Sequence, residues 1–130
     1  MQEIEFFKGR IASTFSPMDY VQAQKNNPDQ YVLVDVRNGP AVLRKEKITG
    51  ALEISQLELE KRIAELPKDK MIVLYCWDVW CNTAAKSAVL LLENGYTVKE
   101  LAGGIAAWKT MNFPTTALSL EENTDSSCGC

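Results

Sequence analysis

The sequence predicts a single α/β domain with a central parallel sheet and helices on both faces. Two apolar runs lie at residues 31–37 (YVLVDVR) and 71–75 (MIVLY). Neither alternates apolar and polar residues as a half-exposed strand does, and this absence of alternation is typical of strands covered on both faces. Helical patterns lie between the strand patterns, which indicates βαβ units. With 130 residues, 46% of them hydrophobic and 24% charged, the chain is expected to form one core.

Two helices are expected before the first long strand. Ile4, Phe7 and Ile11 recur at helical spacing, so residues 3–12 are expected to form an amphipathic helix that docks on the body. Ser16 followed by Pro17 combines an N-cap serine with proline at the first helical position. A second helix should therefore begin there and end near residue 26.

The elements after residue 37 alternate in the same way. Residues 48–55 are expected to form a short strand, and Ser55 with Glu58 forms a capping box for a helix up to about residue 66. Asn82 is expected to cap a long helix that ends at residue 93, and residues 97–101 form the last strand. The pair Gly103-Gly104 then leads into a short helix.

The chain is accordingly divided into three parts. Residues 1–15 form an N-terminal helical extension, residues 16–118 form the domain, and residues 119–130 form a flexible polar tail that ends in Cys128-Gly129-Cys130.

Charge and composition disfavour several classes of partner and location. The formal net charge is −3, and no cluster of Lys and Arg marks a surface for nucleic acid or anionic lipid. No apolar run approaches the roughly 20 residues that span a bilayer, and the first residues do not resemble a signal peptide. A cytoplasmic protein is therefore expected. In a reducing compartment its four cysteines favour reactive or metal-binding roles over structural disulfides.

Cys76 is the candidate nucleophile. It follows the buried strand 71–75, and ligands of parallel sheets bind beyond the carboxyl ends of the strands. The amides of loop 77–82, together with the start of the next helix, are expected to surround its sulfur and lower its pKa. The chain contains no histidine that could activate the thiol instead. A buried structural cysteine is the alternative, and position alone favours neither.

Several segments together resemble a known family. The segments LVDVR (33–37), ITGALEI (48–54) and IVLYC (72–76), followed by residues 93–114 with LAGGIAAW, are similar in order and spacing to the rhodanese-like sulfurtransferases. The similarity covers about residues 17–114. It implies a five-stranded parallel sheet, no cofactor, and transfer of sulfane sulfur through a persulfide on Cys76. The partners would be a small-molecule or protein sulfur donor and a thiol or other nucleophilic acceptor.

The loop after Cys76 departs from the commoner family pattern. It resembles a branch whose longer loop runs Cys, four residues, then Cys-Asn, and its expected substrate-binding residues are Trp77, Asp78, Val79, Trp80, Cys81 and Asn82. The loop has no glycine, no basic residue and one carboxylate, so weak turnover of the dianion thiosulfate is expected. The two tryptophans favour either an apolar mouth for a persulfidated protein or organic thiol, or simple packing on the domain.

Cys81 is a candidate second thiol with three interpretations. It is a resolving thiol that attacks the Cys76 persulfide, a second sulfur carrier, or a residue that only packs. Asp35 and Arg37, at the end of the first long strand, are expected to support the structure, with Glu46 as a partner of Arg37.

The tail pair Cys128 and Cys130 is a Cys-x-Cys motif on a tether. It could bind a soft metal or exchange sulfur with Cys76, or have no fixed role. Two thiols fall short of the four ligands of a closed zinc site, and no metal site is predicted.

Two other functions remain open at the level of sequence. One is a dithiol redox protein or sensor that cycles Cys76 and Cys81 through a disulfide. The other is a catalytically silent interaction module, in which Cys76 would have the reactivity of an ordinary thiol.

Overall fold

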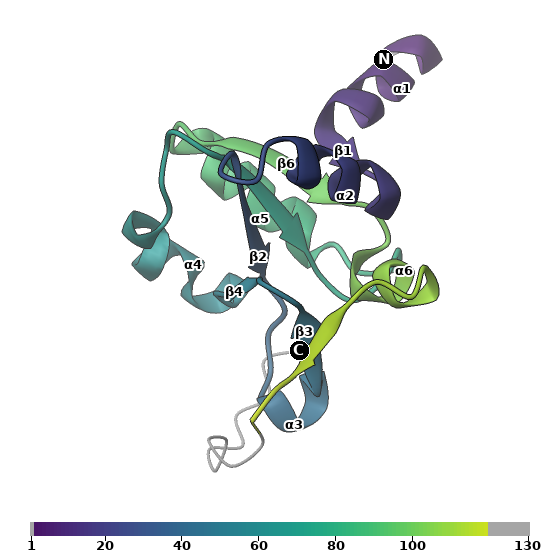
Figure 1. Ribbon diagram of the computed structural model, residues 1–130. Coiled ribbons are helices and arrows are strands. Elements are labelled where there is room, and N and C mark those ends of the chain that lie inside the picture. Colours follow the sequence, from purple (N-terminus) through teal and green to yellow (C-terminus); the bar gives the residue numbers. More distant parts are fainter. Residues whose placement is uncertain (1, 120–130) are drawn as a thin grey trace.

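The computed structural model describes residues 2–119, and its centre is a five-stranded parallel sheet (Figure 1). The strand order is β1-β6-β5-β2-β4, and every neighbouring pair runs parallel. The strands are β1 (Thr14–Phe15), β2 (Tyr31–Asp35), β4 (Leu52–Glu53), β5 (Met71–Tyr75) and β6 (Thr97–Leu101). The predicted single α/β domain with a parallel sheet is confirmed.

Helices connect these strands, and a second small sheet lies beside them. The helices are α1 (Glu3–Ser13), α2 (Pro17–Asn26), α3 (Ala41–Arg44), α4 (Gln56–Arg62), the 3-10 helix η1 (Ile63–Glu65), α5 (Thr83–Glu93) and α6 (Gly104–Thr110). The small sheet pairs β3 (Glu46–Ile48) antiparallel with β7 (Thr115–Ala117).

The sheet separates two apolar cores, and alternation along β5 feeds both of them. Ile72 and Leu74 enter the core that contains residues of α4 and α5, whereas Val73 and Tyr75 enter the core that contains residues of α2 and α6. Successive side chains of a strand point to opposite faces, so an apolar run without alternation is what a doubly covered strand requires. Cys76 continues the first series and belongs to the core on the α5 side.

Helix α1 is confirmed, but its predicted docking is wrong. No residue of α1 is buried, and Ile4, Phe7 and Ile11 are 59%, 53% and 75% exposed. The helix runs directly into β1, the edge strand of the sheet, and projects away from the body (Figure 1). Residues 14 and 15, expected in the extension, therefore belong to the sheet.

Of three local expectations, the first is confirmed and the other two are wrong. The hydroxyl of Ser16 accepts the N–H of Asp19 at 3.1 Å, so the cap of α2 is confirmed. Residues 48–55 are not one strand, because a turn at 49–50 divides β3 from β4. Ser55 makes no side-chain cap, and the side chain of Asn38 instead accepts the N–H of Leu57 in the first turn of α4 at 3.1 Å.

Candidate functional site

Cys76 lies directly after β5, at the carboxyl edge of the sheet, and its side chain is only 1% exposed. This is the position at the end of the strand that the sequence predicts. Alternation along β5 directs the Cys76 side chain toward the core that includes Ala84, at the start of α5. The sulfur is thus placed at the beginning of an 11-residue helix.

The first turn of α6 holds the backbone around Cys76. The N–H of Ile105 donates to the carbonyl of Cys76, and the N–H of Ala106 donates to the carbonyl of Trp77, both at 3.0 Å. This close approach requires glycine at position 104, where φ is +60° and an added Cβ would lie 2.4 Å from the Cys76 oxygen. The Gly-Gly pair therefore allows one helix to orient two peptide groups of the active loop.

That orientation determines which amides face the sulfur. In a trans peptide the C=O and N–H point in opposite directions, so fixing the Cys76 carbonyl toward α6 turns the Trp77 N–H away from α6. The N–H groups of Trp77 and Ala84 both hydrogen-bond the Cys76 sulfur and favour its anionic form. Ala84 was not among the predicted amides, although its place in the first turn of α5 is the signal that could have identified it.

Fewer loop amides face the Cys76 sulfur than the sequence predicts. The N–H of Val79 donates to the carboxylate of Asp78 at 2.6 Å, and the N–H of Cys81 donates to the Asp78 carbonyl at 3.1 Å. Asn82 makes no side-chain cap on α5. The loop satisfies its own amides through a turn, which leaves fewer of them for the sulfur.

The expected lowering of the Cys76 pKa is wrong for this conformation. Burial raises the pKa of the Cys76 thiol to about 12, and the N–H groups of Ala84 and Trp77 offset only part of that effect. The side chain of Cys81 raises it further. The Cys76 thiol donates its proton to the carbonyl of Cys81 at 3.3 Å, an interaction that only the neutral form can make.

Cys81 lies in the opposite situation. It is partly exposed, and its Sγ lies 3.2 Å from the hydroxyl oxygen of Thr83. Although burial acts to raise its pKa, the hydroxyl and N–H of Thr83 and the Cys76 thiol more than offset this, and the pKa of Cys81 is lowered. The side chains of Cys76 and Cys81 each shift the pKa of the other, so the two thiols titrate as a pair.

The two loop tryptophans have different environments. The ring of Trp77 lies under the guanidinium of Arg37, whose central carbon is 4.6 Å from the ring centroid, so Trp77 packs on the domain. Val79 and Trp80 are 82% and 70% exposed at the tip of the loop. Asp78 is partly exposed beside them and Asn82 is exposed.

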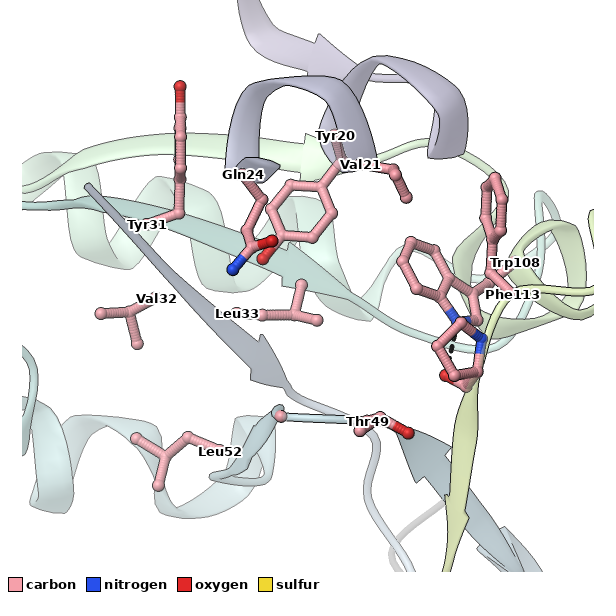
Figure 2. Close-up of a pocket in the computed structure, with 12 residues that line it drawn as sticks. Tyr20, Val21, Gln24, Tyr31, Val32, Leu33, Thr49, Leu52, Trp108 and Phe113 are labelled. Atoms are coloured by element: carbon pink, nitrogen blue, oxygen red, sulfur yellow. Dashed lines mark hydrogen bonds between the residues drawn. The ribbon is translucent and has the colours of Figure 1, made fainter. Parts of the chain in front are cut away.

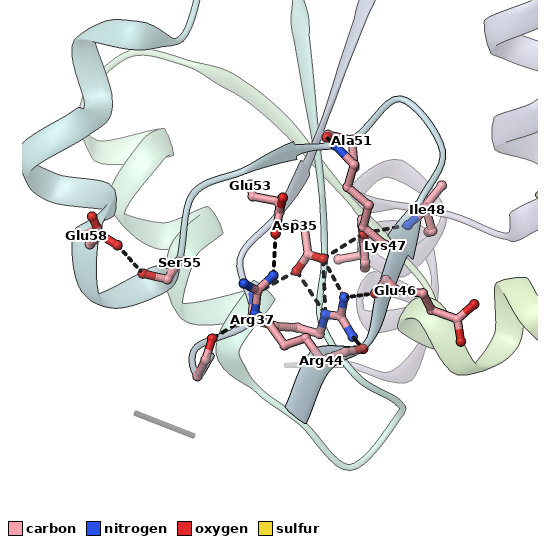
Figure 3. Close-up of polar contacts among 12 residues, drawn as sticks. Asp35, Arg37, Arg44, Glu46, Lys47, Ile48, Ala51, Glu53, Ser55 and Glu58 are labelled. Carbon is pink, nitrogen blue, oxygen red and sulfur yellow. Dashed lines mark hydrogen bonds and ion pairs between the residues drawn. The ribbon is translucent and has the colours of Figure 1, made fainter. Parts of the chain in front are cut away.

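Asp35 and Arg37 tie the end of β2 to the neighbouring loops (Figure 3). The guanidinium of Arg37 donates to both carboxylate oxygens of Asp35, with a shortest distance of 2.7 Å, and the hydroxyl of Tyr75 donates to the same carboxylate at 2.8 Å. Although burial acts to lower the pKa of Arg37, the bond to Asp35 more than offsets this and the pKa is raised. Both side chains are at most 2% exposed, in keeping with the expected support role.

The expected partner of Arg37, Glu46, is bound through its backbone. Arg37 donates to the Glu46 carbonyl at 2.6 Å (Figure 3), whereas the Glu46 carboxylate pairs with Lys109 at 2.6 Å. Glu46 is therefore a partner of Arg37 through its backbone and not through its carboxylate, because Asp35 already occupies the guanidinium.

A pocket of about 470 Å³ lies apart from the cysteines (Figure 2). Tyr20 and Gln24 extend from α2 over β2, and Trp108 and Phe113 line the pocket near α6. None of its lining residues belongs to residues 76–82, and its β2 residues come from the beginning of the strand and not from the carboxyl edge. The candidate site is therefore the cysteine loop and not this pocket.

Within residues 2–119, no three His, Cys, Asp or Glu side chains gather in a way that could hold a metal ion. No helix in that range is long and apolar enough to cross a membrane. Cys128 and Cys130 lie outside the described residues, so their predicted roles stay predictions.

Comparisons with known proteins agree with the fold described above. The model of the rhodanese-like domain family matches residues 17–111. A sulfurtransferase of Allochromatium vinosum is 33% identical over 93 residues, which cover 68% of this chain and 81% of that protein. An HTH-type transcriptional regulator of Mycobacterium tuberculosis is 32% identical over 91 residues, which cover 70% of this chain but only 40% of the regulator. The crystal structure of a full-length Lactobacillus plantarum protein superimposes with a TM-score of 0.83 and 31% identity, covering 89% of this chain and 97% of that one.

Proposed function

The chain belongs to the family of rhodanese-like domains, and on that premise we propose that it is a sulfurtransferase that carries sulfane sulfur as a persulfide on Cys76. The similarity to a sulfurtransferase supports this chemistry at the level of the family. The sulfur would be taken from a small-molecule or protein donor and passed to a thiol or another nucleophilic acceptor.

One observation carries the proposal: the sulfur of Cys76 faces the N–H groups of Trp77 and Ala84. These donors do not react with sulfur, and they stabilise a negative charge placed between them. In the neutral thiol, burial outweighs them. A charged persulfide cannot donate to the Cys81 carbonyl as the thiol does, so we expect this carbonyl to turn away when Cys76 is loaded.

The proposal is tested by loading and retention of sulfur. The full chain is incubated with glutathione persulfide, the donor is removed by gel filtration, and the protein is measured by intact mass and peptide mapping. Wild type should retain one added sulfur atom on the Cys76 peptide and release it to dithiothreitol. Cys76→Ser should carry no sulfur at residue 76, and fragmentation of the peptide assigns any sulfur that it retains to another cysteine. A wild-type protein that retains no sulfur on Cys76 would refute the proposal.

The dithiol alternative is favoured by the proximity of the two cysteines, because the Cys76 thiol donates to the Cys81 carbonyl and each thiol shifts the pKa of the other. Neighbouring thiols can be oxidised to a disulfide if their geometry permits it. A dithiol redox protein would show a reversible two-electron potential and no retained sulfur.

The silent-module alternative is favoured by the raised pKa of Cys76. A domain of this kind would bind a partner through its fold without transferring sulfur. It would show neither sulfur retention nor a reversible Cys76–Cys81 disulfide, which distinguishes it from the two preceding functions.

A further inference from the structure

The two cysteines of the active loop differ in access to solvent. Cys76 is 1% exposed, and its thiol hydrogen is engaged by the carbonyl of Cys81. The backbone on the opposite side is closed by α6, because the Cys76 and Trp77 carbonyls accept the N–H groups of Ile105 and Ala106. A donor persulfide attached to a peptide or a protein therefore has no direct path to the Cys76 sulfur in this conformation.

Cys81 lies between that buried sulfur and the exposed tip of the loop. It follows Val79 and Trp80, which are mostly exposed, and its own side chain is partly exposed. Its sulfur lies 3.2 Å from the hydroxyl oxygen of Thr83, and its backbone carbonyl accepts from the Cys76 thiol at 3.3 Å. Cys81 therefore contacts the buried Cys76 thiol while part of it remains open to solvent.

From this juxtaposition we infer that Cys81 is the entry thiol of the proposed sulfurtransferase, which takes the sulfane sulfur from the donor and relays it inward to Cys76. The inference rests on the proposed function and adds a second reacting residue to it. The order of sulfur loading is then donor, Cys81, Cys76.

Each step of the relay is an exchange at a sulfane sulfur. In the first, the Cys81 thiolate attacks the terminal sulfur of a donor R–S–SH, the donor S–S bond breaks, Cys81–S–SH forms and R–S⁻ leaves. In the second, Cys76 attacks the terminal sulfur of Cys81–S–SH, the S–S bond at Cys81 breaks, Cys76–S–SH forms, and the Cys76 thiol proton passes to the departing Cys81 sulfur. The summed oxidation state of the sulfur atoms does not change in either step, so no oxidant or reductant is needed.

The ionisation of the pair agrees with this order. The pKa of Cys81 is lowered and that of Cys76 is raised, so the first proton leaves the more accessible thiol. Thr83 contributes through its hydroxyl and its N–H at the start of α5. The relayed sulfur then moves from a site open to water into one enclosed by protein.

The test follows sulfur in time in the full chain with Cys128 and Cys130 replaced by serine in every variant. Each protein is mixed with glutathione persulfide, quenched rapidly with an alkylating agent, and mapped by peptide mass. Wild type should gain sulfur on Cys81 before Cys76. Cys76→Ser should gain sulfur on Cys81 at the wild-type initial rate, and Cys81→Ser should load Cys76 at least about 10-fold more slowly.

Two controls separate the relay from damage to the loop. Val89→Ala removes an exposed side chain from α5, the helix that follows the loop, and should load at the wild-type rate. Iodoacetamide labelling of the unmutated pair should modify Cys81 first as the pH rises, which needs no variant that could misfold.

The outcomes distinguish the relay from the proposed function. If Cys81→Ser loads Cys76 as fast as wild type, or if Cys76 is labelled first, the relay is wrong while the persulfide carrier stands. Prompt release of sulfide with a Cys76–Cys81 disulfide also overturns the relay, because it makes Cys81 a resolving thiol. If wild type gains no sulfur on either residue, both proposals fail.

Discussion

The N–H of Ile105 donates to the carbonyl of Cys76 at 3.0 Å, which joins the first turn of α6 to the residue proposed to carry sulfur. The bond depends on the residue before it, because Gly104 has a positive φ and passes within contact distance of the Cys76 and Trp77 backbone. The arrangement of the active loop is thus set from a helix that lies almost 30 residues away in sequence.

Gly104→Ala is expected to destabilise the protein by at least about 2 kcal/mol, because the added Cβ meets the Cys76 carbonyl and the positive φ disfavours alanine. Urea denaturation measures the effect. Gly9→Ala is the matched control, since nothing lies within 4 Å of its added Cβ in α1, and it should not lower the midpoint. Equal midpoints for the two variants would contradict the role given to Gly104.

Asp35→Asn is expected to lower the free energy of unfolding by about 3–5 kcal/mol, because it leaves the buried guanidinium of Arg37 without its counter-ion. Thermal or urea unfolding measures this loss. Glu65→Gln removes the carboxylate of the Arg62–Glu65 surface pair and should leave the midpoint nearly unchanged. A similar small effect for Asp35→Asn would show that the network is dispensable.

The stability of wild type should fall with pH above about 9, and part of that fall should disappear in Cys76→Ser. The pKa of Cys76 is about 12 in the folded chain and near 9.0 as a free thiol. Between these values the native state binds more protons than the unfolded state, so the stabilisation is complete below pH 9 and is lost as the pH rises toward 12. The slope from one proton is at most about 1.4 kcal/mol per pH unit. Urea titrations between pH 8 and 11 compare the two proteins, and parallel curves would exclude the effect.

Glu46→Gln is expected to reduce stability at neutral pH but not in acid. Hydrogen bonds from Lys109 and Thr115 lower the pKa of Glu46 in the folded chain below its ordinary value. The stabilisation is therefore fully present above that ordinary value and lost as the pH falls through the lowered one. Unfolding midpoints of wild type and variant should converge as the pH falls below about 4, and a constant difference across pH would contradict this account.

Asp78→Asn is expected to raise kcat/KM for thiosulfate about 5-fold at low ionic strength. The variant removes a carboxylate whose repulsion raises the free energy of the bound dianionic donor by about 1 kcal/mol. The asparagine can still accept the Val79 N–H, so the turn is kept. Asp69→Asn, in the turn before the opposite end of β5, should have no effect. A gain that does not shrink with added salt would point away from electrostatics.

Much of the fold could be predicted because its signals are local. Residues 31–35 and 71–75 carry continuous apolar runs, and Ser16 and Pro17 lie at the start of α2 where a cap and a first-turn proline belong. β1 has only two residues and no pattern of its own, so its pairing with β6 gave no signal in sequence. Likewise, Ser55 and Asn82 have the residue types of N-caps, but whether a cap forms depends on which polar groups the neighbouring loops bring.

The sequence by itself determined that Cys76 ends a buried strand, that a second cysteine follows five residues later, and that a Gly-Gly pair opens the last helix. Only the tertiary structure decided that Cys76 is enclosed and Cys81 partly open, and that two amides face the buried sulfur. The physical reason is that burial and peptide orientation depend on contacts between distant segments. Here α6 turns the Cys76–Trp77 peptide, and the loop folds its own carbonyl over the thiol.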